Sequence, residues 1–243
     1  SGGSESDFGF KANGSDAITR DFIIRNLGSG LLAGIEIPTT LGSSFSVDPL
    51  SQVPPRLDPG EEFTVRVIYD LPEWVTGSSF SDGNLQIHST DANTPLFHVD
   101  LSGTGGTAAQ GAGRAFSDAG LSGADAAPDA TPFNDGVENL LKYAFNMDLS
   151  GPDVSQLQPG GSSGLPSGGL VEEGGETVFR VEFIRRKHSG LSYIPRKSGT
   201  LEPGAVEPMA GAVTVEDIDG QWERVTVDEP CDAATEYRCF SVV

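Results

Sequence analysis

The sequence has few basic residues, few aromatic residues and no long apolar run. Aromatic side chains make up 8% of the 243 residues, and apolar helical stretches are almost absent. No segment approaches the roughly 18 consecutive apolar residues of a membrane-spanning helix, so we expect no membrane insertion. With 15 basic against 35 acidic residues the formal charge is −20. Nucleic-acid phosphates and anionic lipids would be repelled, so we predict no nucleic-acid partner.

The acidic residues are spread along the chain and are not gathered in a tail. Residues 1–105 carry 5 basic and 14 acidic side chains, and residues 106–243 carry 10 and 21. A dispersed acidic surface suits salty or calcium-containing extracellular fluid, and it equally suits any soluble protein that must not aggregate. Both interpretations stay open at this point.

Glycine and proline are abundant, at 32 and 16 residues, which favours strands joined by turns. In the first hundred residues, segments with period-two apolar patterns follow one another at intervals of about ten residues. The clearest are AITRDFIIRN and EEFTVRVIYD, the second with Phe63, Val65, Val67 and Tyr69 on one side. The sequence therefore predicts a β-sandwich over residues 1–105.

Three motifs in this half resemble a known family. They are RNLGSG at a strand end, LDPGEE before a long strand, and STDANTP leading to LSGTG. Together they resemble the Hydin/ASH-like, choice-of-anchor D type, immunoglobulin-like modules of bacterial secreted proteins. The resemblance implies an immunoglobulin-like fold, a spacer or adhesion role, and no catalytic residues.

The next segment, residues 106–113, has the composition of a flexible glycine-rich linker. We expect a second module over residues 114–243. Its apolar residues Val137, Leu140, Leu141, Ala144 and Phe145 are spaced for one face of a helix, predicted at about 136–147. Alternating segments such as TVFRVEFIRRK follow and predict an antiparallel sheet. The overall prediction is a mainly β chain, a sandwich followed by a small α+β module.

This half also resembles a known module. The segments GLSGADAAPDATPFNDGVENLLKYAFNMD and FRVEFIRRKHSGLSYIPRKSGTLEPG are similar to a C-terminal accessory module of large secreted bacterial proteins. In that module the NLLKYAFN helix commonly follows an aspartate-rich loop of the thrombospondin type 3 or dockerin kind. The resemblance implies an accessory domain and assigns it no biochemical role.

The loop before this helix has part of the pattern of a calcium site. Such a loop needs side-chain oxygens at its first, third and fifth positions, glycine at the sixth and a bidentate carboxylate at the twelfth. With Gly136 sixth, the first, third and fifth positions are Thr131, Phe133 and Asp135, and the twelfth is Lys142. Most ligand positions are lost, and the bidentate one carries a cation. We therefore predict no metal and no cofactor here.

The alternative role for this loop is helix capping. Asn134 or Asp135 would accept hydrogen bonds from the first N–H groups of the helix, and Glu138 would add favourable charge in its first turn. A differently wound calcium site built from Asp125, Asp129 or Glu138 stays open.

Two cysteines, Cys231 and Cys239, stand eight residues apart on either side of a polar turn. That spacing is compatible with disulfide geometry across a hairpin, and the even count is consistent with oxidation. We predict a Cys231–Cys239 disulfide, with two buried thiols as the alternative.

One cluster of cations stands out from the acidic background, in FIRRKHSGLSYIPRKSG. Guanidinium and ammonium groups there could bind a sulfated or carboxylated glycan, or could instead neutralise acidic neighbours. Trp74 and Trp222 could form a sugar-stacking platform, although packing residues are the usual alternative. The candidate glycan-binding residues are Arg185, Arg186, Lys187, Arg196 and Lys197.

No nucleophile, metal set or phosphate-binding loop stands out, so we expect no enzymatic activity. The predicted function is a structural or adhesion segment of a larger secreted or cell-surface bacterial protein. Its partners would be neighbouring domains of the same polypeptide, and an extracellular glycan or surface protein. The alternative is a carbohydrate-binding accessory region of an extracellular polysaccharide-degrading enzyme.

Overall fold

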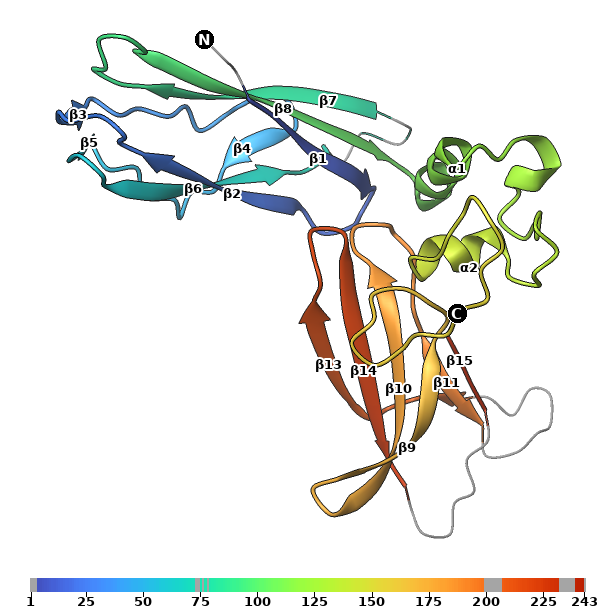
Figure 1. Ribbon diagram of the computed structural model, residues 1–243. Helices are drawn as coiled ribbons and strands as arrows, with labels where there is room; N and C mark the ends of the chain where they lie inside the picture. The colour runs from blue at the N-terminus through green and yellow to red at the C-terminus, as the bar shows by residue number, and fades with distance from the viewer. Residues whose placement is uncertain are drawn as a thin grey trace. The chain divides into compact units, whose positions relative to one another are not determined.

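A computed structural model of the chain describes residues 4–72, 75, 77, 79–198, 207–231 and 239–242 (Figure 1). The fold is mainly β with a small helical part, as predicted. The chain divides into two compact units. The first comprises Ser1–Gly111 with His188–Gly190, and the second comprises Ala112–Lys187 and Leu191–Val243.

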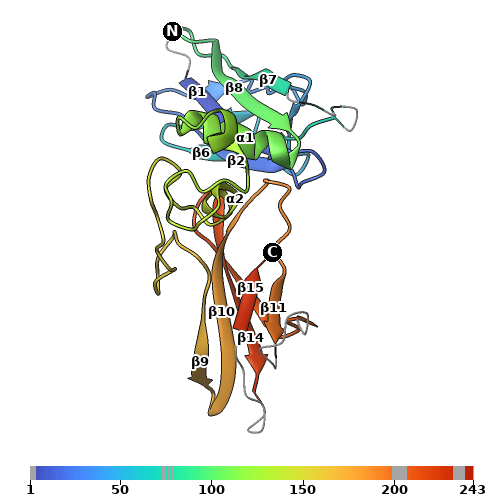
Figure 2. The same ribbon diagram turned by 90° about the vertical axis from the view of Figure 1, so that its right-hand side faces the viewer.

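The first unit consists of two facing three-stranded sheets and one short two-stranded sheet (Figures 1 and 2). One sheet has the order β1-β8-β7, formed by Ser4–Ala12, Leu96–Gly106 and Ser79–His88. The other has the order β2-β6-β4, formed by Ile18–Arg25, Glu62–Tyr69 and Phe45–Val47. The short sheet pairs β3 with β5, Leu32–Ala33 with Arg56–Leu57.

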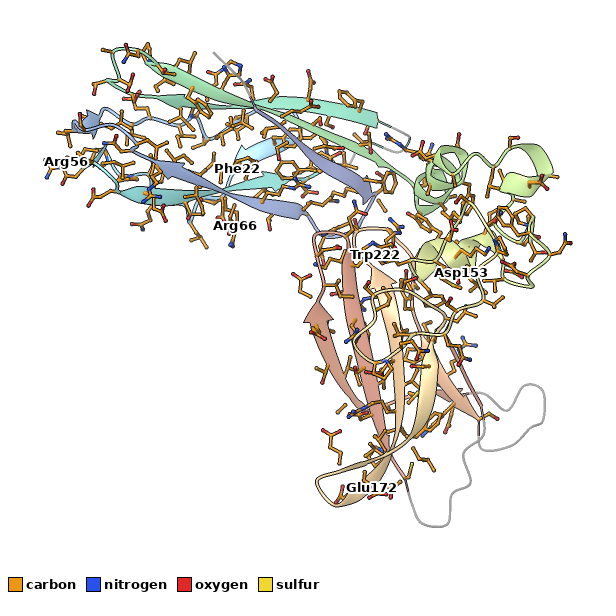
Figure 3. The ribbon with its side chains drawn as sticks, in the orientation of Figure 1. Phe22, Arg56, Arg66, Asp153, Glu172 and Trp222 are labelled. Atoms are coloured by element: carbon orange, nitrogen blue, oxygen red, sulfur yellow. The ribbon has the colours of Figure 1, made fainter. Side chains whose placement is uncertain are left out.

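The core of this unit lies between the two larger sheets. In β6, Val65, Val67 and Tyr69 are fully buried, which confirms the predicted inward face. Phe8, Phe45 and Tyr69 pack their rings together, with the last two stacked at 4.8 Å. Figure 3 shows the same alternation in the labelled side chains of this unit. Phe22 points between the layers and Arg66 points away from them.

The first and last strands of this unit run parallel. Strand β1 pairs with β8 from Ser4 opposite Val99 to Ala12 opposite Gly106. Gly103 faces the core on this strand, and a Cβ built there would lie 2.8 Å from the ring of Tyr69. The glycine in LSGTG therefore makes room for the largest core side chain.

The second unit contains two antiparallel sheets. The larger has the order β13-β14-β10-β9, formed by Ala212–Asp217, Trp222–Pro230, Glu176–Arg186 and Ser167–Glu173. The smaller has the order β12-β11-β15, formed by Glu207–Pro208, Pro195–Ser198 and Cys239–Val242. In β10, Phe179, Val181 and Phe183 are buried against Val225 and Val227 of β14. The antiparallel sheet predicted for this half is present.

The glycine-rich segment 106–113 is not a flexible linker, which corrects the prediction. Strand β8 continues to Gly106, and helix α1 spans Ala108–Asp118. The helix begins at a capping box: Thr107 N donates to Gln110 Oε1 at 2.8 Å, and Gln110 N donates to Thr107 Oγ1 at 3.2 Å. Further along the helix, Ala112 and Phe116 pack against Tyr143 in a small core. Capping and this apolar contact outweigh the low helix propensity of glycine.

The helix predicted at about 136–147 is also shorter than expected. Helix α2 spans Asn139–Ala144, and a 3-10 turn, η1, spans Gly123–Ala126. Gly136 has φ 77° and Asn146 has φ 56°, both left-handed, so neither continues a helix. Met147 N donates to Lys142 O at 2.8 Å, which is the 6→1 bond of a Schellman motif ending the helix.

Candidate functional site

The ammonium of Lys142 in α2 is enclosed by groups of the second unit. Its side chain is fully buried. Lys142 Nζ lies 2.6 Å from Asp135 Oδ2 and donates to Gly151 O at 2.6 Å, and the Phe133 ring centroid is 4.8 Å away. A carboxylate, a carbonyl oxygen and an aromatic face thus surround one cation.

Asp135 does not cap the helix, and the prediction for Asn134 and Asp135 was wrong. The N-cap of α2 is Glu138, without a side-chain capping bond. Asp135 Oδ1 accepts from Val137 N at 3.1 Å, and its Oδ2 accepts from Asp153 N at 2.8 Å as well as binding Lys142. Asn134 has a left-handed φ of 54° in the turn before it. The carboxylate is used to bind Lys142 and to join the 133–137 loop to the 148–153 loop.

The loop carboxylates are held in their ionised form. The hydrogen bond from Lys142 lowers the pKa of Asp135 to about 2. Bonds from the hydroxyl and N–H of Ser150 lower the pKa of Asp148. Partial burial raises the pKa of Asp153, but bonds from Asp148 N and Ser155 N outweigh it, so the net shift is downward. Lys142 therefore lies beside carboxylates that carry negative charge at neutral pH.

The differently wound calcium site stays a prediction. Two of its candidate residues, Asp125 and Asp129, lie in the segment before α2. This segment is held by Asn139 Nδ2, which donates to Asp125 O and Ala127 O, each at 2.8 Å. In the part of the chain that the structure describes, no three His, Cys, Asp or Glu side chains gather as a metal site would require. Within the same residues, no helix is long and apolar enough to cross a membrane.

Most of the candidate glycan-binding cations have intramolecular partners. Arg185 Nε donates to Glu223 Oε1 at 2.7 Å, Lys187 pairs with Asp217, and Lys197 pairs with Glu229. For Arg196, which is half-buried in β11, the described residues include no carboxylate partner. This arrangement favours the alternative that these cations neutralise acidic neighbours.

Arg186 and Trp222 form a packed pair. The Arg186 guanidinium carbon lies 4.0 Å from the Trp222 ring centroid and 4.1 Å from that of Tyr143. Burial lowers the pKa of Arg186. Trp222 is only 5% exposed and packs against Leu157 and Ile184, so its ring offers no open face to a sugar. Trp74, the other candidate, lies outside the described residues.

The predicted disulfide falls partly outside the described residues. Cys231 is half-buried after β14, and its N–H donates to Thr177 O at 3.2 Å. Cys239 begins β15 opposite Ser198, and its side chain is not among those described. The Cys231–Cys239 bond stays a prediction.

A groove on the first unit was not predicted from the sequence. It has a volume of about 600 Å³ and opens along β2 and the turn between β7 and β8. Apolar side chains from both sheets line it, and Ile23, Leu27 and Phe97 at its rim are exposed large hydrophobic residues. Its apolar lining consists of Phe22, Ile23, Ile24, Leu27, Leu32, Leu85, Ile87, Phe97 and Val99.

The groove lies between β2 and the part of β8 around Phe97 and Val99. In the described residues, the pairing of β1 with β8 runs from Ser4 opposite Val99. On the opposite sheet, β2 is an edge strand. Arg20 of β2 donates to Ser6 Oγ at 3.3 Å, which places β1 beside the start of β2. Phe22–Arg25 pair with β6 on one side, and in the described residues no strand pairs with them on the other side.

The sequence contains partial signals for these features. The sequence shows a cation, Lys142, at the twelfth loop position, but its partner Gly151 O lies outside the loop motif. For the groove, the alternation in AITRDFIIRN indicates a mostly apolar side of the strand, and Phe22 and Ile24 on that side pack against the core. Whether these side chains border a groove depends on how β2 and β8 lie relative to each other, and no local pattern encodes that.

No protein-family model matches the chain, and no curated protein matches it. Among solved structures, a protein of unknown function from Porphyromonas gingivalis is 20% identical, covering 42% of this chain and 44% of that one, with a TM-score of 0.32. The VesB protease of Vibrio cholerae is 18% identical, covering 42% and 30%, with a TM-score of 0.30. The secreted serine protease VesC of the same organism is 10% identical, covering 98% and 49%, also at 0.30.

The chain spans less than half the length of each of these structures. Similarity at this level carries no argument about fold or activity. The resemblances to Hydin/ASH-like modules and to the NLLKYAFN accessory module therefore stay predictions.

Proposed function

We propose that the chain is a non-catalytic interaction segment of a larger secreted or cell-surface protein. One observation carries this proposal: the apolar groove of the first unit, which is open to solvent. Exposed apolar patches on folded domains commonly mark binding surfaces, because contact between apolar side chains and water is unfavourable and a bound partner removes it.

The charged groups of the second unit support a structural role for that part. Three of its buried or half-buried cations, Lys142, Arg180 and Lys197, each have a carboxylate of the same unit as partner, whereas Arg196 has none among the described residues. Cations that are paired in this way stabilise the unit. They are less available to an external ligand, because their charge is already neutralised and their side chains are held in place. The second unit thus serves as a stable accessory module.

The alternative is a carbohydrate-binding accessory region of an extracellular polysaccharide-degrading enzyme. The observation in its favour is the residual exposure of Arg185, which is 37% exposed beside Glu223. A guanidinium at such a site can exchange an internal carboxylate for a sulfate or uronate.

Both functions are tested by probing the labelled chain on two arrays, one of glycans and one of peptides with extended and helical sequences. Binding to peptides that is lost in Leu27→Asp, without glycan binding, supports the interaction role. Saturable glycan binding that is lost in Arg185→Ala supports the alternative. An absence of binding on both arrays contradicts both and leaves a spacer without a partner.

A further inference from the structure

We propose that the groove of the first unit binds an extended, lysine- or arginine-bearing peptide segment, which adds as a new strand to the outer edge of β2. This inference rests on the proposed interaction function and specifies the partner. Three features of the groove support it: the backbone groups at its edge, the apolar side chains of its two walls, and the charge of the unit around it.

The backbone of β2 presents hydrogen-bonding groups to the groove. Asn26, just after the strand, donates to Glu61 O and accepts from Gly60 N, both at 2.9 Å, so its polar groups point toward β6. Backbone direction alternates along a strand, which turns the N–H and C=O groups of Ile23 and Arg25 to the opposite edge. Among the described residues, no strand pairs with β2 on that side. An incoming strand would find two donors and two acceptors there.

The walls of the groove suit alternate apolar side chains. Phe22 and Ile24 face inward from β2, and Phe97 and Val99 line the groove from β8. A strand added beside β2 would direct every second side chain between these two pairs and the others to solvent. The floor is formed by Leu85 and Ile87, which are buried in the core. The fitting partner therefore alternates apolar and polar residues.

The charge around the groove selects a cationic partner. Residues 1–105 carry 14 acidic and 5 basic side chains. Asp91 and Arg25 both line the groove, so the negative charge that acts on a partner is that of the surrounding unit as a whole. An acidic surface attracts cationic segments and repels acidic ones. A second copy of this chain carries the same negative charge, so it is disfavoured as the occupant.

The probe is a synthetic peptide of about eight residues, alternating valine and threonine with a lysine at each end. Eight residues cover the edge of a typical strand. Titration into the isotope-labelled chain should give saturable NMR shifts around the groove. Amide hydrogen exchange at Ile23 and Arg25 should slow at least tenfold, because their N–H groups become bonded. A peptide with glutamates replacing the lysines should bind at least tenfold more weakly at low salt.

Two matched comparisons locate the site. Leu27 and Leu50 are both loop leucines, 87% and 85% exposed, and only Leu27 lines the groove. Leu27→Asp should weaken peptide binding at least tenfold, and Leu50→Asp should leave it within about twofold. Ile23→Pro removes the outward N–H, whereas Ile23→Thr keeps it, so only the proline variant should lose binding. Thermal unfolding of all four variants checks that the unit remains folded.

The outcomes separate this inference from the proposed function. If the peptide binds while exchange at Ile23 and Arg25 is unchanged and Ile23→Pro binds normally, strand addition is wrong but the interaction role stands. If the chain self-associates in sedimentation and Leu27→Asp abolishes this, the groove takes a second copy and the proposal is wrong. Failure of both peptides to bind at millimolar concentration also overturns strand addition, and the array results alone then decide the function.

Discussion

At the level of single residues, Lys142 and Asp135 make a connection in the loop of the second unit that a metal ion makes in loops of the calcium-binding kind. A metal ion in such a loop joins carboxylates and carbonyls from distant positions. Here the ammonium of Lys142 joins the carboxylate of Asp135 to the carbonyl of Gly151. Because the ammonium belongs to a side chain of α2, we expect this connection to form without calcium.

Replacing Lys142 by Met should therefore be strongly destabilising, because it leaves the Asp135 carboxylate buried without its counter-charge. We expect a loss of about 3–5 kcal/mol in the free energy of unfolding, measured by urea denaturation. The double variant with Asp135→Asn should recover part of this loss.

The control for this variant is Lys187→Met. Lys187 also pairs with an aspartate, but Asp217 is 74% exposed, so removing that pair should cost at most about 1 kcal/mol. Equal losses in the two variants would show that the enclosure of Lys142 adds nothing to stability.

The Asp135–Lys142 pair predicts that the stability of the folded chain falls at acid pH. The pKa of Asp135 in the folded chain is about 2, below its ordinary value of 3.8. Because the folded-state pKa is lowered, its stabilising contribution is fully present above about pH 4 and is lost as the pH falls toward 2. The stability difference between the native chain and Asp135→Asn should shrink over that interval. A difference that stays constant from pH 5 to pH 2 would contradict the lowered pKa.

At the level of elements, the strands could be predicted far better than the helices. Period-two patterns such as Phe179, Val181 and Phe183 report directly which face is buried, and the structure confirms them. Helix α1 was not predicted because its glycines suggested a linker, although Thr107 and Gln110 have the spacing of a capping box and form one. The candidate sites could not be predicted, because they depend on how loops distant in sequence meet.

Two glycines of α1 offer a test of how this helix packs. A Cβ at Gly111 would lie 2.4 Å from the ring of Phe10, whereas a Cβ at Gly113 would meet nothing within 4 Å. Gly113→Ala should raise stability by about 0.5–1 kcal/mol through helix propensity alone. Gly111→Ala has the same propensity gain but must displace an aromatic ring, so we expect net destabilisation.

Thermal unfolding of the two variants measures the difference. If Gly111→Ala were as stable as Gly113→Ala, α1 would not be held against Phe10. If both were neutral, the segment would behave as the flexible linker that its composition suggested.

At the level of the whole molecule, calcium could act on stability in two ways. It could screen the charge of −20, or it could bind a specific site, and the described residues contain no cluster of metal ligands. Divalent cations screen a dispersed negative surface and reduce its self-repulsion, so any such cation should stabilise the chain slightly. A specific site would respond to calcium alone.

Millimolar calcium should therefore raise the melting temperature no more than magnesium at equal ionic strength. A site that bound only the folded chain, at a hundredfold excess over its dissociation constant, would add about 2.7 kcal/mol, a shift of several degrees. With Lys142 bound to Asp135 in the loop, no such shift is expected there. A calcium-specific rise that Asp135→Ala abolished would mean that calcium displaces the ammonium. A rise that survived this variant would instead place a site elsewhere, with Asp125, Asp129 and Glu138 the first positions to replace.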